Sequence, residues 1–217
     1  RRKLLKKTNS AVMQNYLANP FPDKKELIRN VDIVSLDFET TGLNKEKDRV
    51  VSIGTVNIVQ LGINLTSSSH QLISTNRNLP ESSVVIHQIT DTQLTDAMSI
   101  DTALPVLLNK LSGKVMLAHN AKVELGFINN MCQELYGSDF VIPVIDTQYL
   151  AKRSFERENR AFKSNELRLF NLRESFNMPA YKAHNALMDA IATAELFLAM
   201  VSKISPDNNA CLNDFLS

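Results

Sequence analysis

Three strand-like segments in succession, beginning at residue 31, most constrain what this chain can fold into. Each is rich in β-branched or other apolar residues, and polar turn-forming stretches separate them. The segments are VDIVSLDFE, RVVSIGTVNIVQL and a third run near HQLISTN, with TTGLNKEKD and LGINLTSSS between them. Consecutive strands joined by short connections usually pair with each other, so this part of the chain predicts a meander.

Helical and strand patterns alternate along the rest of the chain. In order they are helices around SSVVIHQIT and over 99–112, the strand KVMLAH, the helix AKVELGFINNMCQELYG, the strand FVIPVIDT, helices through 150 and over 166–176, and a last helix from near 184 to about 201. Strands that alternate with helices tend to run parallel. We therefore expect an α/β domain whose mixed five-stranded sheet is flanked by helices.

The first 30 residues differ from the rest in charge. They hold eight Lys or Arg residues and two acids, although the whole chain has a net charge of only +1. Residues 3–17 have apolar residues at helical spacing, a stripe that we expect to pack on the domain, and the two prolines of ANPFPD end the pattern. We predict a basic helical extension over 1–30, a main domain over 31–205 and a tail over 206–217. RRKLLKK is either an arm for an anionic partner or a solvated face.

Composition and motif searches exclude several classes of protein. No apolar run approaches the roughly 18 to 20 residues of a membrane span, so we expect a soluble, cytoplasmic protein without membrane contact. Cys132 and Cys211 lack metal-site spacing and are expected to be free thiols. His70, His87 and His119 lack zinc-site spacing. Glycine-rich phosphate loops and nucleophile elbows are also missing from the sequence.

Two carboxylates end the first strand-like segment. Asp37 and Glu39 are two residues apart, so both side chains leave the same face of the strand. Adjacent like charges repel unless a cation lies between them. The carboxyl ends of strands commonly carry the functional site of an α/β sheet, and the backbone at Thr40, Thr41 and Gly42 offers amides nearby. The pattern predicts a cation site, with an acidic turn after a core strand as the alternative.

The last helix contains an acid where burial is expected. From Ala186 to Val201 only Asp189, Thr193 and Glu195 interrupt an apolar sequence, and a helix that is apolar on nearly every side is buried. A buried, unpaired carboxylate either takes up a proton or binds a cation, and a ligand role explains Asp189 better than solvent does. His184, five residues earlier, is a candidate general base near neutral pH or a structural histidine.

Two further acids, Glu124 and Asp146, each have a structural role as an alternative to metal binding. Glu124 follows AHNA at the expected start of a helix, where an acid either complements the helix dipole or joins the carboxylate cluster. Asp146, in VIDT, ends a strand-like segment, and we interpret it as a turn or capping residue rather than a ligand.

The motifs LDFETTGL, AHNAKVELGFI and AHNALMDAIATAEL, in this order, resemble those of the DnaQ-like, DEDDh family of 3′→5′ exonucleases, which includes the DNA polymerase III epsilon subunit. IHQIT and VIDT add to the resemblance, which covers about residues 31–202 and suggests a stand-alone member. It implies a ribonuclease H-like fold. It also implies a metal-dependent enzyme in which His184 is the general base and two Mg²⁺ or Mn²⁺ ions are held by four ligands: Asp37, Glu39, Glu124 and Asp189.

The resemblance also implies a substrate and partners. We expect hydrolysis of the 3′ ends of single-stranded DNA or short RNA to nucleoside 5′-monophosphates. The residues expected to hold the terminal nucleotide are Thr40, Thr41, Gly42, His87, Ile89, His119 and Asn120. The basic stretch 152–168 is a candidate for phosphate contact or for ion pairing on helix surfaces. A polymerase or a second copy of the chain is a candidate partner for the N-terminal helix.

Two positions depart from the family pattern. Val123-Glu124 stands where the family usually has Phe-Asp, and Ser52 stands where the second strand often carries an acid. The longer Glu124 side chain adds a methylene at a position where placement matters within about 0.5 Å. The alternative function is therefore a catalytically weakened DnaQ-like domain that binds nucleic acid or a polymerase.

Overall fold

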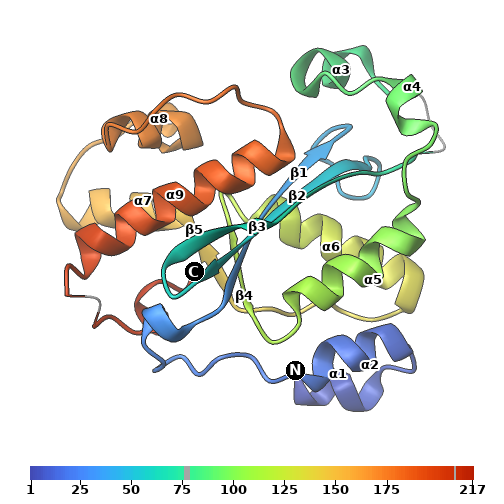
Figure 1. Cartoon of the computed structure of the whole chain (residues 1–217), viewed down its shortest axis with the longest axis horizontal. Helices are drawn as coiled ribbons and strands as arrows, with labels where there is room; N and C mark the ends of the chain where they lie inside the picture. Colours follow the sequence, from blue (N-terminus) through green and yellow to red (C-terminus); the bar gives the residue numbers. More distant parts are fainter. Residues whose placement is uncertain (76–78, 208) are drawn as a thin grey trace.

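The fold is built on a single five-stranded sheet with strand order β3-β2-β1-β4-β5 (Figure 1). A computed structural model describes residues 1–75, 79–207 and 209–217. The strands are β1 Ile33–Thr40, β2 Val50–Val59, β3 Gly62–Leu72, β4 Val115–Ala118 and β5 Val144–Asp146. β1, β2 and β3 pair antiparallel, whereas β4 pairs parallel with β1 and β5. The meander and the mixed sheet predicted from the sequence are confirmed.

Strand β3 begins at Gly62 rather than near His70, so the interpretation of LGINLTSSS as a connection was wrong. Gln60 and Leu61 have φ values of 52° and 56°, which makes a tight two-residue hairpin turn without glycine in those positions. The polar residues that follow lie on an exposed edge strand, where Ser and Thr side chains can face solvent. The expected third strand also included Asn76, which lies outside the described residues.

Helices cover both faces of the sheet (Figure 1). The helices of the domain are α3 Glu81–His87, α4 Asp91–Leu94, α5 Ile100–Leu111, α6 Lys122–Tyr136, α7 Thr147–Arg157, α8 Leu169–Ser175 and α9 Ala186–Ile204. Short 3-10 helices cover Ile28–Asn30, Ser164–Leu167 and Leu212–Asp214. β1 sends Val34, Leu36 and Phe38 into a core with α5 and α6, and Ile33 into a core with α7, α8 and α9.

The alternation along β1 decides where its carboxylates point. Ser35 shares a face with Asp37 and Glu39, and its Oγ donates a hydrogen bond of 2.7 Å to the carbonyl of Ala190 in α9. Both carboxylates therefore leave β1 on the face that α9 covers. This places the carboxyl end of β1 beside the first turn of α9.

Three predicted elements differ from the structure in length or continuity. The helix predicted over 3–17 is two helices, α1 Arg2–Lys7 and α2 Ala11–Ala18, because the Ser10 side chain accepts the Met13 amide and starts a new helix. The pattern SSVVIHQIT gives α3 and α4, since Gln88 has a φ of 59° and ends α3. The strand expected over FVIPVIDT is shortened to β5 after Pro143, which lacks a donor N–H.

Both chain ends pack on the domain. Met13, Tyr16 and Leu17 of α2 are buried in the core beside α5, which confirms the expected packing of the N-terminal apolar stripe. Phe215 meets Phe197 of α9 edge-on, with ring centroids 5.7 Å apart.

The division of the chain at residues 30 and 205 stays a prediction. Within the described ranges, no helix is both long and apolar enough to cross a membrane.

Candidate active site

A glycine in β2 lets the first turn of α9 lie directly on the sheet. Gly54 is the cross-strand partner of Asp37, and a Cβ atom added to it would lie 2.1 Å from the carbonyl carbon and oxygen of Ala186. The backbone of α9 therefore touches the backbone of β2. This close approach brings Asp189 to the carboxylates of β1, so that Asp37, Glu39 and Asp189 each offer an oxygen within 4.8 Å of the other two.

Glu124 reaches the same region from the first turn of α6. Its side chain is only 3% exposed, and its charge raises the pKa of Asp37 in addition to the larger effect of burial. The group of three carboxylates with mutually close oxygens does not include Glu124. Glu124 is thus close enough to Asp37 for their charges to interact. Direct binding of a metal ion by Glu124 remains a prediction.

Asp146 fixes the start of α6. Its carboxylate accepts hydrogen bonds from the backbone amides of Asn120 at 3.0 Å, Ala121 at 3.1 Å and Gln148 at 2.9 Å. It is the N-cap of α7, so the prediction of a capping residue is confirmed. Asp146 also raises the pKa of Glu124, whose own burial is the larger cause.

The site favours protonated carboxyl groups unless a cation balances their charge. Burial, followed by repulsion from Asp189, raises the pKa of Glu39 from 4.5 to about 7. Burial raises the pKa of Glu124 from 4.5 to about 8. Burial also raises the pKa of Asp189, against the opposing effect of the His184 amide that bonds to it. Close, desolvated carboxylates of this kind are costly when ionised.

Two buried oxygens fit a cation. Within the described part of the chain, Glu124 Oε2 and Asp189 Oδ1 are buried and have no hydrogen-bond partner. An unpartnered buried carboxylate oxygen costs free energy that a bound cation would remove. The available donors are all carboxylate oxygens, which Mg²⁺ and Mn²⁺ prefer over nitrogen or sulfur. The residues present therefore fit divalent metal binding.

His184 lies in the loop before α9 and is held by its backbone. Its amide donates a 3.0 Å hydrogen bond to Asp189 Oδ2, its φ is 67°, and its side chain is exposed. His87, the last residue of α3, is close enough for the charge of His184 to lower its pKa, after the larger effect of burial. His87 Nδ1 accepts the amide of Ile89 at 3.0 Å, and Nε2 has no partner among the described residues. The two histidines therefore belong to one region.

The turn after β1 is held by a residue that sequence reasoning missed. Asp48 accepts the Thr41 hydroxyl at 3.1 Å and the Asn44 amide at 2.8 Å. A Cβ atom on Gly42 would lie 2.5 Å from the Asp48 carboxylate, so a larger residue here would require the Asp48 side chain to move. Thr40 Oγ1 donates to the Gly42 carbonyl at 2.8 Å. Asp48 gave no sequence signal, because it lies in a polar turn.

His119 makes two hydrogen bonds inside the protein. Its Nδ1 lies 2.8 Å from Thr147 Oγ1, and its Nε2 lies 2.9 Å from the Leu167 carbonyl. Burial lowers its pKa to about 4. These contacts join β4 to α7 and the following 3-10 helix. Substrate contact by His119, as by Asn120, stays a prediction.

Ser52 Oγ lies 2.7 Å from His70 Nε2, so a neutral pair stands where the family often has an acid.

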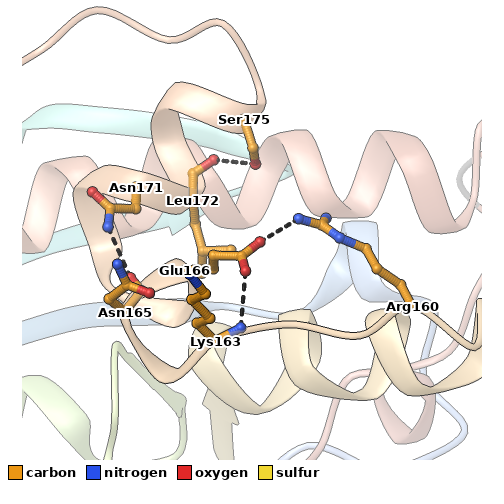
Figure 2. Close-up of polar contacts among 7 residues, drawn as sticks. All are labelled: Arg160, Lys163, Asn165, Glu166, Asn171, Leu172 and Ser175. Atoms are coloured by element: carbon orange, nitrogen blue, oxygen red, sulfur yellow. Dashed lines mark hydrogen bonds and ion pairs between the residues drawn. The ribbon is translucent and has the colours of Figure 1, made fainter.

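The basic stretch 152–168 is partly neutralised by its own acids. Arg160 pairs with Glu166 at 2.5 Å, and the second Glu166 oxygen accepts the amide of Lys163 at 2.8 Å (Figure 2). Lys152 pairs with Glu156 at 3.7 Å. Lys152 and Arg160 therefore form ion pairs with acids of the same stretch, which is the alternative to phosphate contact that the sequence left open.

Known proteins share these features over most of the chain. The exonuclease family model RNase_T matches residues 34–197. The epsilon subunit of DNA polymerase III from Treponema pallidum is 30% identical over 184 residues, which cover 85% of this chain and 83% of that protein. DNA polymerase III PolC-type from Thermotoga petrophila is 34% identical over 172 residues, which cover 79% of this chain but only 12% of that protein.

The fold is also similar to that of a solved exonuclease. The nuclease domain of 3′hExo, a DEDDh family member bound to rAMP, superposes with a TM-score of 0.67 at 16% identity and covers 79% of this chain and 92% of its own. The chain therefore belongs to the DnaQ-like RNase_T exonuclease family and has a ribonuclease H-like fold.

Proposed function

We propose that this protein is a metal-dependent 3′→5′ exonuclease that releases nucleoside 5′-monophosphates from the 3′ ends of single-stranded DNA or short RNA. The observation that carries the proposal is the carboxylate cluster, in which oxygens of Asp37, Glu39 and Asp189 lie within 4.8 Å of one another. The buried Glu124 stands beside it with an unpartnered oxygen.

The four carboxylates would hold two divalent cations, Mg²⁺ or Mn²⁺. Such ions supply Lewis-acid stabilisation of the charge that builds up on phosphoryl oxygens during in-line displacement. The raised pKa values of Glu39 and Glu124, at about 7 and about 8, favour a site that binds cations in exchange for protons. Metal binding should therefore strengthen as pH rises through this range.

His184 is the proposed general base. Its side chain is exposed beside the carboxylates, while its backbone amide is fixed to Asp189. In this role the imidazole takes the proton of the attacking water, a task suited to a histidine near neutral pH. His87 and Ile89, with the turn at Thr40, Thr41 and Gly42, would hold the terminal nucleotide.

Both DNA and RNA are proposed as substrates, because the similar proteins include examples linked to each. The family includes epsilon subunits of DNA polymerase III, and the 3′hExo structure holds rAMP. We also propose a cytoplasmic protein that can contact a polymerase or a second copy of itself through the N-terminal helices, because α1 exposes Arg2, Lys3, Lys6 and Lys7.

A catalytically weakened, nucleic-acid-binding domain is the second candidate. Two observations favour it: Glu124 replaces the usual shorter acid, and Ser52 bonds to His70 where an acid is common. In this case the protein would bind single strands without shortening them.

One assay separates the two functions. The protein is incubated with 5′-labelled single-stranded DNA and RNA in Mg²⁺ or Mn²⁺, beside the Asp189→Asn variant and the Glu134→Gln variant. Glu134 is an exposed acid on α6 and serves as the charge-matched control. Stepwise shortening by wild type and Glu134→Gln, but not by Asp189→Asn, supports the exonuclease. Binding without shortening supports the second candidate, and equal shortening by Asp189→Asn refutes the proposed site.

A further inference from the structure

The segment that carries His184 begins at a buried arginine. Arg173, near the end of α8, is 1% exposed, although arginine is rarely fully buried unless it is paired. Residues 176–185 connect α8 to the start of α9 (Figure 1). The buried charge thus lies at the base of the loop that presents the proposed general base.

Arg173 bonds to both the loop and α9 through its two terminal nitrogens, whereas its buried Nε has no partner among the described residues. Its Nη2 donates to the carbonyl of Pro179 at 3.1 Å, and its Nη1 donates to the carbonyl of Ala192 at 2.8 Å. Nη1 also lies 2.7 Å from Glu195 Oε2. One guanidinium group therefore joins the loop to the helix that carries Asp189.

Tyr181 completes this arrangement from the loop side. The Arg173 Cζ lies 4.5 Å from the centroid of the Tyr181 ring, and the Tyr181 hydroxyl donates to Glu195 Oε1 at 2.9 Å. Both carboxylate oxygens of Glu195 are therefore engaged, one by each partner. We call Arg173, Glu195 and Tyr181 the loop clamp.

We propose that the loop clamp positions His184 for proton transfer, with Arg173 and Tyr181 as positioning residues. This inference rests on the proposed exonuclease function. Tyr181 is three residues before His184, and the His184 amide is bonded to Asp189 Oδ2, so the short segment between them is anchored to α9 at both ends. The loop and Asp189 are thereby held to the same helix.

The backbone of His184 makes such anchoring necessary. A non-glycine residue with a φ of 67° is in the left-handed region, which is uncommon and persists when the surroundings determine it. A further contact of the loop, from Lys182 Nζ to Gln88 Oε1 at 2.8 Å, joins exposed side chains and should contribute little. The loop clamp differs in that its guanidinium group is buried, while Tyr181 and Glu195 are partly buried.

A role in stability alone would predict something different. A buried ion pair often contributes little net stability compared with apolar residues of the same volume. Removing one charge of such a pair is costly to the fold, so the loop is best loosened at the Tyr181 hydroxyl, whose loss leaves the contacts of Arg173 with α9 in place. Loop order and catalytic rate should therefore change more than the stability of the fold.

The test uses Tyr181→Phe, which removes one hydroxyl and keeps the ring. Tyr149→Phe is the matched control, because Tyr149 also faces an arginine, with Arg153 Cζ 5.7 Å from its ring centroid, but lies on α7. We expect Tyr181→Phe to lower kcat on single-stranded DNA about fivefold to tenfold, with KM changed by less than about twofold. Amide hydrogen exchange over 180–184 should become faster, and Tyr149→Phe should match wild type.

A double-mutant cycle with His184→Ala tests whether the effect of Tyr181→Phe on the rate depends on His184. If the clamp acts through His184, adding Tyr181→Phe to His184→Ala should change the residual single-turnover rate by less than about twofold. An equal loss in both backgrounds, or wild-type exchange and kcat in Tyr181→Phe, overturns the inference. Failure of the proposed function is recognised separately, since wild type would then not shorten the substrate, and faster hydrogen exchange in Tyr181→Phe would still report on the clamp.

Discussion

Replacing Gly54 by alanine tests how α9 is brought onto the sheet. The added Cβ would lie 2.1 Å from the carbonyl carbon and oxygen of Ala186 and 2.3 Å from the Leu187 amide nitrogen. All three atoms belong to the backbone of α9, so no side-chain rotation can relieve the overlap. Ordinary contact begins at 3.4 Å, which means that the first turn of α9 must retreat by more than 1 Å.

Stability and activity should both fall in the Gly54→Ala variant. Overpacking in a close-packed interior costs about 1 to 3 kcal/mol, and a backbone overlap belongs at the upper end of this range. The same retreat carries Asp189 away from Asp37 and Glu39, and a misplacement of about 1 Å in an active site can lower the rate about 100-fold. Urea unfolding and kcat on a single-stranded substrate measure the two effects.

Gly62→Ala is the control for Gly54→Ala on the same hairpin. A Cβ on Gly62 would lie 3.4 Å from the Val59 carbonyl oxygen, which is an ordinary contact, so stability should change by less than about 1 kcal/mol. Wild-type stability and wild-type kcat in Gly54→Ala would refute the inferred backbone contact between β2 and α9. A loss of stability with unchanged kcat would show that the contact does not place Asp189.

Three further predictions concern the carboxylates. Glu124→Gln should abolish metal-dependent activity, whereas Glu124→Asp should retain it; steady-state kinetics measure both, and an active Glu124→Gln would return Glu124 to a helix-dipole role. The folded-state pKa values of Glu39 and Glu124 are raised from 4.5 to about 7 and about 8, so the stabilising contribution of these groups is complete below pH 4.5 and is lost as pH rises through 7 to 8. In EDTA, the free energy of unfolding should therefore fall between pH 5 and pH 8.5, on the order of 3 kcal/mol for Glu39 alone, and Mn²⁺ should restore it most at high pH. A flat or rising profile in EDTA would contradict this. Asp146→Asn weakens the cap shared by α6 and α7 and should cost about 1 to 2 kcal/mol in urea unfolding; an unchanged stability would show that the capping bonds are not needed.

The sequence was most informative where a pattern repeats along one element. The period-two runs predicted the meander, and the apolar last helix predicted the burial of Asp189, because both signals depend on local periodicity and burial. The spacing of Asp37 and Glu39 correctly placed both carboxylates on one strand face. The resemblance in motif order then brought His184 and Glu124 to the same site.

The remaining features depend on contacts between distant segments. The start of β3 was missed because an exposed edge strand tolerates a run of Ser and Thr that reads as a loop, and because Gln60 and Leu61 form its turn without glycine. The break between α1 and α2 depends on a single cap at Ser10. The burial of Arg173 could not be predicted from the sequence, since an arginine in a polar helical stretch is normally exposed.

Anomalous diffraction from crystals soaked with Mn²⁺ and a nucleoside 5′-monophosphate would show whether the carboxylate cluster holds metal beside a bound nucleotide. We expect Mn²⁺ peaks among the oxygens of Asp37, Glu39 and Asp189, with Glu124 bound directly or through water and the phosphate of the nucleotide beside His184. Absence of Mn²⁺ from these carboxylates, or its binding elsewhere with the nucleotide, would refute the proposed metal site.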